Sequence, residues 1–141
     1  MTLDCPVFQY AHDVLDGKIV AGRLVKLACT RHIRDLAEGP ARGLVWNQEK
    51  ANRAIEFFGY LRLTEGEFND KPFELQPSQK FIVGSLFGWC GTDGYRRFRT
   101  AYIEQAKGSG KTPLLSGIGL YGLVADGEHG AEIYAGATTR E

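Results

Sequence analysis

The sequence predicts an α/β fold in which a helical N-terminal lead, residues 1–72, precedes the first part of a parallel sheet in residues 73–141. Two observations predict it. In the first half, apolar residues recur at helical spacing. In the second half, a segment in which apolar and polar residues alternate is followed by several small residues and then by an apolar run. This is the pattern of a strand, a loop and the start of a helix.

The composition is that of one ordinary globular domain. The 141 residues are 43% hydrophobic and 24% charged, which suits a single core. The formal net charge is zero, so contact with DNA needs a local patch or residues outside this chain. No apolar run is long enough to cross a bilayer, and the N-terminus lacks the pattern of a signal peptide. We therefore expect a cytoplasmic protein without a membrane partner.

The first ordered element is predicted over residues 7–36, with Asp16-Gly17 as the point where it can split into two helices. Cys29 and His32 lie three residues apart on one face of it, but no second closely spaced ligand pair completes a zinc site. We interpret them as a buried cysteine and a surface histidine. The three cysteines are too widely spaced for a disulfide framework, so we expect reduced thiols. Glu38-Gly39-Pro40 ends the helix, with glycine as its C-terminal cap.

Two further helices are predicted before the alternating stretch. One begins at the N-cap Asn47, and the other begins near Ser78 and ends before the turn at residues 91–94. Residues 61–77 form an extended connection with room for one short strand. The apolar positions that we expect on the inward faces of the two helices are Ala51, Ala54, Ile55 and Phe58, then Phe81, Ile82, Leu86 and Trp89, with Ser85 among them.

The second half contains a candidate phosphate loop. Residues 97–104 alternate like a strand, Gly110-Lys111-Thr112 follows, and the apolar run to Val124 reads as a helix, before a second strand at residues 131–135. Backbone N–H groups of Gly108, Ser109, Gly110 and Lys111 can converge on a β-phosphate. The Lys111 ammonium would lie over the β- and γ-oxygens and Thr112 Oγ would bind Mg²⁺. Gln105 occupies the position of the first consensus glycine.

A second piece of nucleotide chemistry precedes this loop. Gln79 stands at the start of the third predicted helix, and the aromatic Phe73 lies a few residues before it. A glutamine amide donates and accepts at once, so it can pair with adenine N6 and N7 while Phe73 stacks on the base. The other interpretation is that Gln79 is a surface residue at a helix start.

Several motifs, in the right order, resemble the N-terminal part of the large terminase subunit of tailed bacteriophages. The segments that carry the resemblance are Gly17-Lys-Ile-Val, Arg31-His-Ile-Arg-Asp-Leu, residues 71–83, Leu86-Phe-Gly-Trp, Arg96-Arg-Phe-Arg, Gly110-Lys-Thr and residues 130–140. Large terminases are DNA-packaging motors with an N-terminal ATPase and a C-terminal nuclease. The resemblance implies a P-loop NTPase fold, ATP and Mg²⁺ as cofactors, and Gln79 as the residue that reads adenine.

The resemblance also implies that Lys107 to Thr112 form a variant Walker A loop. Lys107 takes a position usually held by arginine, where a cation neutralises the γ-phosphate, although lysine lacks the bidentate fork. Ser78 stands where the family tends to have tryptophan, and Gly108 and Ser109 replace bulkier residues. Implied partners are double-stranded DNA, a small terminase subunit and a portal protein, in the cytoplasm of a bacterial host.

The predicted ATPase domain is incomplete in these residues. No apolar strand ending in Asp-Glu follows residue 135, so we expect the Walker B carboxylates and the nuclease to be absent from this chain. The open face of the sheet then needs a missing C-terminal part or self-association to cover it. Two other functions fit the motifs: another P-loop DNA translocase or helicase, and a non-catalytic interaction domain in which Gly-Lys-Thr only starts a helix.

Overall fold

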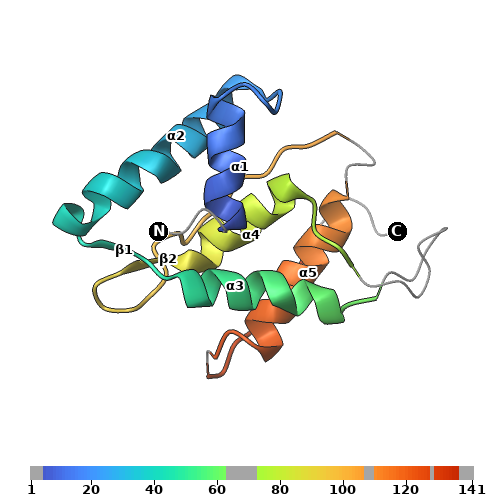
Figure 1. Ribbon diagram of the computed structural model, residues 1–141. Helices are drawn as coiled ribbons and strands as arrows, with labels where there is room; N and C mark the ends of the chain where they lie inside the picture. Colours follow the sequence, from blue (N-terminus) through green and yellow to red (C-terminus); the bar gives the residue numbers. More distant parts are fainter. Residues whose placement is uncertain (1–4, 63–72, 107–109, 128, 137–141) are drawn as a thin grey trace. The chain divides into compact units, whose positions relative to one another are not determined.

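The computed structural model describes residues 5–62, 73–106, 110–127 and 129–136 (Figure 1). The chain divides into two compact units, Met1–Glu104 and Gln105–Glu141, and each is described by itself. Helices and a small sheet make up the first unit, whereas the described part of the second has one helix followed by extended chain. The expected mixture of helix and strand is confirmed at this level.

Four α-helices build the first unit: α1 (Pro6–Leu15), α2 (Arg23–Glu38), α3 (Gln48–Phe57) and α4 (Pro77–Gly88). Helix α4 lies between α1 and α3 and contacts both, and α1 also packs on α2 (Figure 1). Because α4 has neighbours on more than one side, its buried residues do not form a single stripe. The core between α1, α2 and α4 contains Val7, Tyr10, Ala11, Val14, Cys29 and Phe81.

The predicted split at Asp16-Gly17 is confirmed. Helix α1 ends at Leu15, Gly17 has a φ of 83°, and α2 begins at Arg23. A positive φ of this size favours glycine because other residues have a Cβ that clashes with the backbone. The chain can therefore reverse here and return as α2 against α1.

Helix α2 ends at Glu38, as predicted, but Gly39 is not a left-handed cap. Gly39 has a φ of −59°, and the chain continues as the 3₁₀ helix η1 (Gly39–Arg42) before turning at Gly43, whose φ is 76°. A Cβ on Gly39 would lie 3.2 Å from Leu44 Cβ. Close packing, rather than a left-handed conformation, therefore explains glycine at position 39.

Asn47 starts α3, as predicted, because its side chain accepts a hydrogen bond from Lys50 N–H at 3.0 Å. Ala51, Ala54 and Phe58 are fully buried, the last in the 3₁₀ helix η2 (Phe58–Tyr60). The small alanines allow α4 to approach closely. The connection predicted over residues 61–77, including its short strand, lies mostly outside the described residues.

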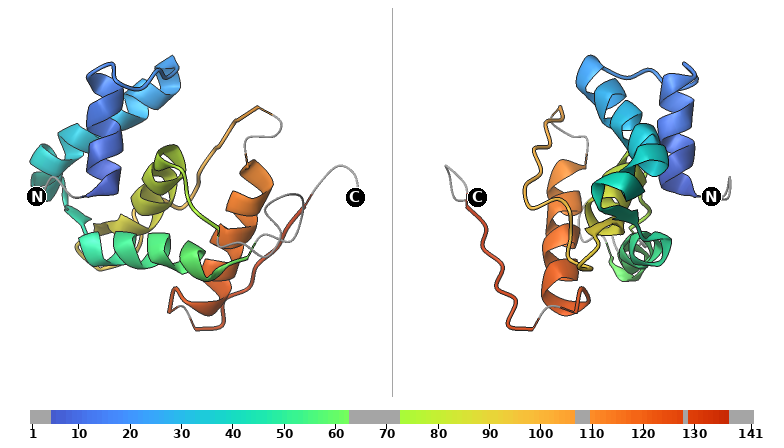
Figure 2. Two further views of the ribbon diagram at one scale, coloured as in Figure 1. Left: turned by 45° about the vertical axis from the view of Figure 1, so that its right-hand side comes forward. Right: turned by 90° about the vertical axis from the view of Figure 1, so that its left-hand side faces the viewer.

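The sheet differs from the prediction. Strands β1 (Leu44–Trp46) and β2 (Trp89–Gly91) pair antiparallel, so Trp89 begins a strand and is not the end of the helix. Residues 97–104 and 131–135, the two predicted strands, are not strands in the structure, so those two predictions are wrong (Figure 2). Backbone pairing with β2 reaches Arg97, whose N–H donates to Trp89 O at 2.9 Å. An alternating pattern becomes a strand only where another strand completes its hydrogen-bond ladder, and neither β1 nor β2 pairs with residues 98–104 or 131–135.

The second unit contains α5 (Lys111–Val124), with both ends at the predicted residues. After the helix, the extended segment of residues 131–136 places Ile133 Cγ2 3.4 Å from the Cβ position of Gly119. None of the helices within the described ranges is long and apolar enough to cross a membrane.

Candidate nucleotide site

The described part of the phosphate loop ends in a left-handed glycine. Gly110 has φ 82° and ψ 18° and is the N-cap of α5. A residue with a Cβ is strained in this conformation, so glycine at this position is required by the backbone. Lys107, Gly108 and Ser109, the other predicted loop residues, lie outside the described residues.

At the start of α5, no side chain of a described residue caps the helix. The first backbone bond of the helix runs from Leu114 N–H to Gly110 O at 3.2 Å. The N–H groups of Lys111 and Thr112 therefore lack partners within the helix, whereas Pro113 has no N–H to satisfy. Two N–H donors at the positive end of a helix dipole form a suitable site for a phosphate oxygen.

The Lys111 side chain contacts the main chain of Gln105. Its Nζ donates a hydrogen bond to the carbonyl oxygen of Gln105 at 3.4 Å. This contact uses the main chain of residue 105, so it is compatible with glutamine where the consensus has glycine. A phosphate oxygen would form a shorter, charge-assisted bond with the same ammonium group and would replace the carbonyl.

Gln79 lies at the start of α4 but is not on the surface, so the surface interpretation is wrong. It is only 6% exposed, and its Oε1 accepts a hydrogen bond from Gln76 N–H at 2.9 Å. The Gln76 side chain in turn accepts from Gln79 N–H, which completes a capping box. The box fixes the orientation of the amide and leaves Oε1 a second lone pair. Adenine recognition by Gln79 remains a prediction.

Phe73 is largely buried. It is 9% exposed, and its ring centroid lies 5.5 Å from that of Phe58. An open pocket of about 440 Å³ borders it, lined also by Ile55, Glu56, Gly59, Tyr60, Glu74, Leu75 and Lys80. Because Phe58 already packs on the ring, a base that stacks on Phe73 would have to enter from this pocket.

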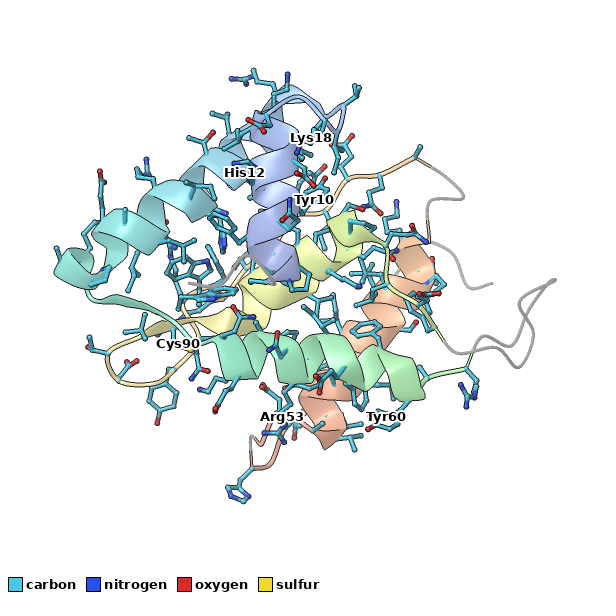
Figure 3. All side chains as sticks on the ribbon, viewed as in Figure 1. Tyr10, His12, Lys18, Arg53, Tyr60 and Cys90 are labelled. Carbon is cyan, nitrogen blue, oxygen red and sulfur yellow. The ribbon has the colours of Figure 1, made fainter. Side chains whose placement is uncertain are left out.

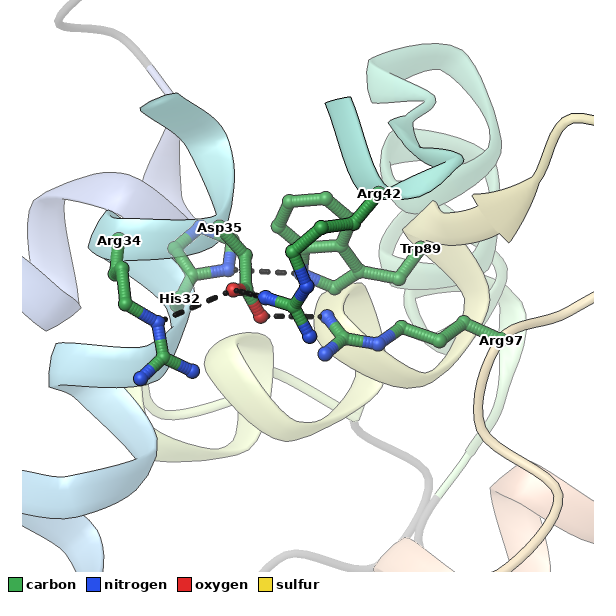
Figure 4. Close-up of polar contacts among 6 residues, drawn as sticks. All are labelled: His32, Arg34, Asp35, Arg42, Trp89 and Arg97. Carbon is green, nitrogen blue, oxygen red and sulfur yellow. Dashed lines mark hydrogen bonds and ion pairs between the residues drawn. The ribbon is translucent and has the colours of Figure 1, made fainter. Parts of the chain in front are cut away.

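A buried carboxylate that was not among the predicted site residues joins three segments of the first unit. Asp35 is fully buried and forms ion pairs with Arg97 at 2.8 Å, Arg42 at 2.9 Å and Arg34 at 3.4 Å (Figure 4). Burial raises the pKa of Asp35, but hydrogen bonds and positive charge from Arg97 and Arg34 outweigh it, and the pKa is below its ordinary value. We call Arg31, Arg34, Arg42 and Arg97 with Asp35 the arginine cluster.

His32 corrects another prediction, because it is buried and not on the surface. It is 3% exposed, and Trp89 Nε1 donates to its Nδ1 at 3.0 Å (Figure 4). The rings of Trp46 and Trp89 meet it edge to face. Burial lowers the pKa of His32 to about 4, although the charge on Asp35 opposes that shift.

Cys29 is buried, as predicted, and burial raises the pKa of its thiol to about 11. Cys5, Cys29 and Cys90 are all free thiols. In the ranges that the structure describes, no group of three or more histidine, cysteine, aspartate or glutamate residues is arranged to hold a metal ion.

One signal in the sequence pointed to the buried groups. Cys29, His32 and Asp35 recur every three residues, which places all three on the inward face of α2. The segments Arg31 to Leu36 and Arg96 to Arg99, two of the motifs behind the terminase resemblance, meet at this carboxylate. Only the folded chain shows that the two motifs contact the same carboxylate.

Comparison with known families bears on the second half of the chain. Residues 77–141, somewhat under half of the sequence, match the family model described as terminase large subunit, ATPase domain. Residues 77–141 are therefore similar to the ATPase domain of terminase large subunits. The match begins at the first residue of α4 and includes Gln79 and Gly110-Lys111-Thr112, so the suspected terminase ATPase segment is confirmed. Searches of curated proteins and of solved structures found no match.

Proposed function

We propose that this chain provides ATP-binding elements of a terminase large subunit, the motor that packages double-stranded DNA into procapsids. The observation that carries the proposal is the start of α5, all of it within the terminase match: left-handed Gly110, two N–H groups without helical partners, and the Lys111 ammonium 3.4 Å from Gln105 O. The family match supports ATPase chemistry at a coarse level. The residue roles below are our proposal.

In this proposal the backbone of residues 108–111 binds the β-phosphate, and Lys111 neutralises the β- and γ-oxygens. Thr112 Oγ is a ligand of the nucleotide-bound Mg²⁺, and Lys107 approaches the γ-phosphate. Gln79 pairs with the adenine edge while Phe73 supports the base. Duplex DNA, a small terminase subunit and a portal protein are the proposed partners, in the cytoplasm of a bacterial host.

The phosphate loop is tested by titrating Mg·ATP into the chain and its Lys111→Ala variant. We expect at least a tenfold loss of affinity in the variant, because one charge-assisted bond to phosphate contributes about 1.5–3 kcal/mol. Lys18→Ala is the matched control, since Lys18 is an exposed lysine at the end of α1, far along the chain from the loop (Figure 3). Equal affinity in the wild type and Lys111→Ala would favour the interaction-domain alternative.

Adenine recognition is tested with Gln79→Glu. A carboxylate oxygen can still accept from Gln76 N–H and keep the capping box, but it cannot donate to adenine N7. The wild type should prefer ATP over GTP by about 1–3 kcal/mol, the value of one bidentate contact. Gln79→Glu should bind ATP more weakly than the wild type, because the carboxylate still accepts from the N6 amino group but cannot donate to N7. Competition between labelled and unlabelled nucleotide measures both affinities. If both proteins bind ATP equally, Gln79 serves the helix cap alone.

A further inference from the structure

The outward face of α2 carries an unusual concentration of positive charge. Residues 17–34 contain five basic residues and no acidic residue, although the chain as a whole has zero net charge. Arg23, Lys26, Arg31 and Arg34 are exposed. Arg23 and Arg34 are eleven residues apart, about three helical turns, so they share one face over roughly 16 Å.

The arginine cluster continues this face beyond the end of α2. Arg34 and Arg42 are about half exposed, and both bind the same oxygen of the buried Asp35, Oδ1. Two guanidinium groups on one oxygen atom lie close together, and each retains N–H donors that this carboxylate does not use. Asp35 therefore holds the guanidinium groups of Arg34 and Arg42 in place at the surface. Less side-chain entropy is then lost when these two groups bind an anion.

Arg31 adds a third guanidinium to the same surface. It lies 4.9 Å from the centre of the Phe98 ring, and Arg97 lies 4.8 Å from the same centre. Burial together with the charges of Arg97 and Arg34 lowers the pKa of Arg31, only partly opposed by Asp35. Asp35 and the exposed Glu38 are the acidic residues at this end of α2, so positive charge remains in excess.

We propose that the outward face of α2 and the arginine cluster form a binding site for the phosphodiester backbone of duplex DNA. Arginine forks match phosphate oxygens in geometry, and a basic stripe on one helix is the electrostatic footprint of a backbone contact. The choice of DNA rests on the proposed packaging function, whereas the anion site rests on the arrangement of the arginines. The proposed site binds duplex DNA independently of the base sequence, because its contacts are to phosphate groups.

The test measures binding of a labelled duplex of random sequence to the 141-residue chain, without nucleotide, between 50 and 200 mM KCl. Each phosphate contact contributes about 0.9 to the slope of log affinity against log salt. In the double variant Arg34→Gln/Arg42→Gln, we expect the slope to fall by about two and the affinity to fall about tenfold or more at low salt. Arg53→Gln, on α3, is the matched control and should bind like the wild type (Figure 3).

A second variant covers the case in which the double variant loses its fold, as circular dichroism would show. Arg31→Gln leaves all three ion pairs of Asp35 intact, and it should lower the slope by about one. Wild-type affinity and slope in Arg31→Gln and in a folded double variant would overturn the proposal. An equal loss in Arg53→Gln would do the same, because it would show general charge attraction.

Competition experiments with the labelled duplex identify which kind of anionic molecule the surface binds. ATP and inorganic phosphate should displace the duplex only as far as their ionic strength does, and displacement by ATP beyond that would assign the cluster to a nucleotide. Polyglutamate should also be a weak competitor. If it competes as well as unlabelled duplex, the surface, which exposes Leu24 and Leu27 beside the arginines, binds an acidic protein instead. Because the duplex titrations of the wild type and variants contain no nucleotide, their failure leaves the Mg·ATP titration unaffected, and the reverse also holds.

Discussion

At the scale of single residues, His32 shows most clearly that the surroundings of a side chain, and not its residue type, determine its burial and its charge. A histidine on a helix with basic neighbours is ordinarily a solvated group, yet this one is enclosed by aromatic rings and accepts a hydrogen bond from Trp89. Protonation would place a proton on Nδ1, facing the Trp89 N–H donor, in addition to burying a charge. The folded chain therefore holds His32 in its neutral form.

This predicts an acid-sensitive stability with a defined pH window. The pKa of His32 is about 4 in the folded chain and 6.5 in an unfolded one, so between these values only the unfolded chain binds the proton. The stabilisation is complete above pH 6.5 and is lost as pH falls towards 4, by about 3 kcal/mol. Urea unfolding at several pH values measures it.

The control for this prediction is His32→Gln, because a glutamine oxygen can still accept from Trp89 but does not titrate. The dependence on pH between 6.5 and 4 should flatten in this variant. Asp35 affects stability in a separate pH range. Its pKa in the folded chain is below the ordinary value of 3.8, so its contribution to stability is complete above pH 3.8 and is lost only at lower pH. An unchanged profile in His32→Gln would assign the effect to other groups.

At the scale of elements, the packing of α4 depends on glycines that lie in its interior. A Cβ on Gly84 would lie 2.3 Å from Val7 Cγ2, and one on Gly88 would lie 2.6 Å from Trp46 Cζ3. Glycine is a weak helix former, so the two glycines lower the intrinsic stability of α4. In return, they allow close contact of α4 with α1 and with β1. The small side chain is needed because of the neighbours and not because of the backbone conformation.

Gly84→Ala should therefore destabilise the chain, although alanine is the better helix former. Val7 is fully buried and β-branched, so it cannot rotate away from the added methyl group. Overpacking of about 1–3 kcal/mol outweighs a gain in propensity of about 1 kcal/mol. We expect a net loss of about 1–2 kcal/mol in urea unfolding. Gly59→Ala should change stability little, because no other described residue has an atom within 4 Å of the Gly59 Cβ position, its two chain neighbours aside. A comparable loss in Gly59→Ala would argue against this packing.

At the scale of the whole molecule, the chain consists of two units of very different content. Met1–Glu104 has a buried core, a sheet and the arginine cluster, whereas the described part of Gln105–Glu141 has α5 and extended chain. The two groups of predicted nucleotide contacts fall in different units, Gln79 in the first and Lys111 in the second.

We predict that residues 1–104 fold alone and that residues 105–141 do not. Sixteen of the eighteen buried apolar residues in the described ranges belong to the first unit, whereas a segment of under about 40 residues rarely forms a stable core. Helix α5 has 14 residues, and isolated helices of about this length are marginal in water. Circular dichroism and urea unfolding of the two fragments measure this. A cooperatively folded 105–141 fragment, or an unfolded 1–104 fragment, would contradict it.

What the sequence alone determined is the local structure. Asn47 starts α3, Gly17 separates α1 from α2, and α5 runs from Lys111 to Val124, each as predicted. Caps, glycine breakers and apolar periodicity act within a few residues, so they can be identified without knowing the fold. The terminase resemblance over residues 77–141 belongs here too, because ordered motifs are a property of the chain.

What only the tertiary structure decided are the pairings between distant segments. Residues 97–104 have the alternation of a strand, but their pairing with β2 stops at Arg97 and they do not form a strand, whereas β1 and β2 pair although neither was predicted. Asp35 is buried because Arg42 and Arg97 meet it, and His32 is buried because Trp89, 57 residues later, donates to it. A strand's ladder and a buried charge both require partners far along the chain, and only folding brings those partners together.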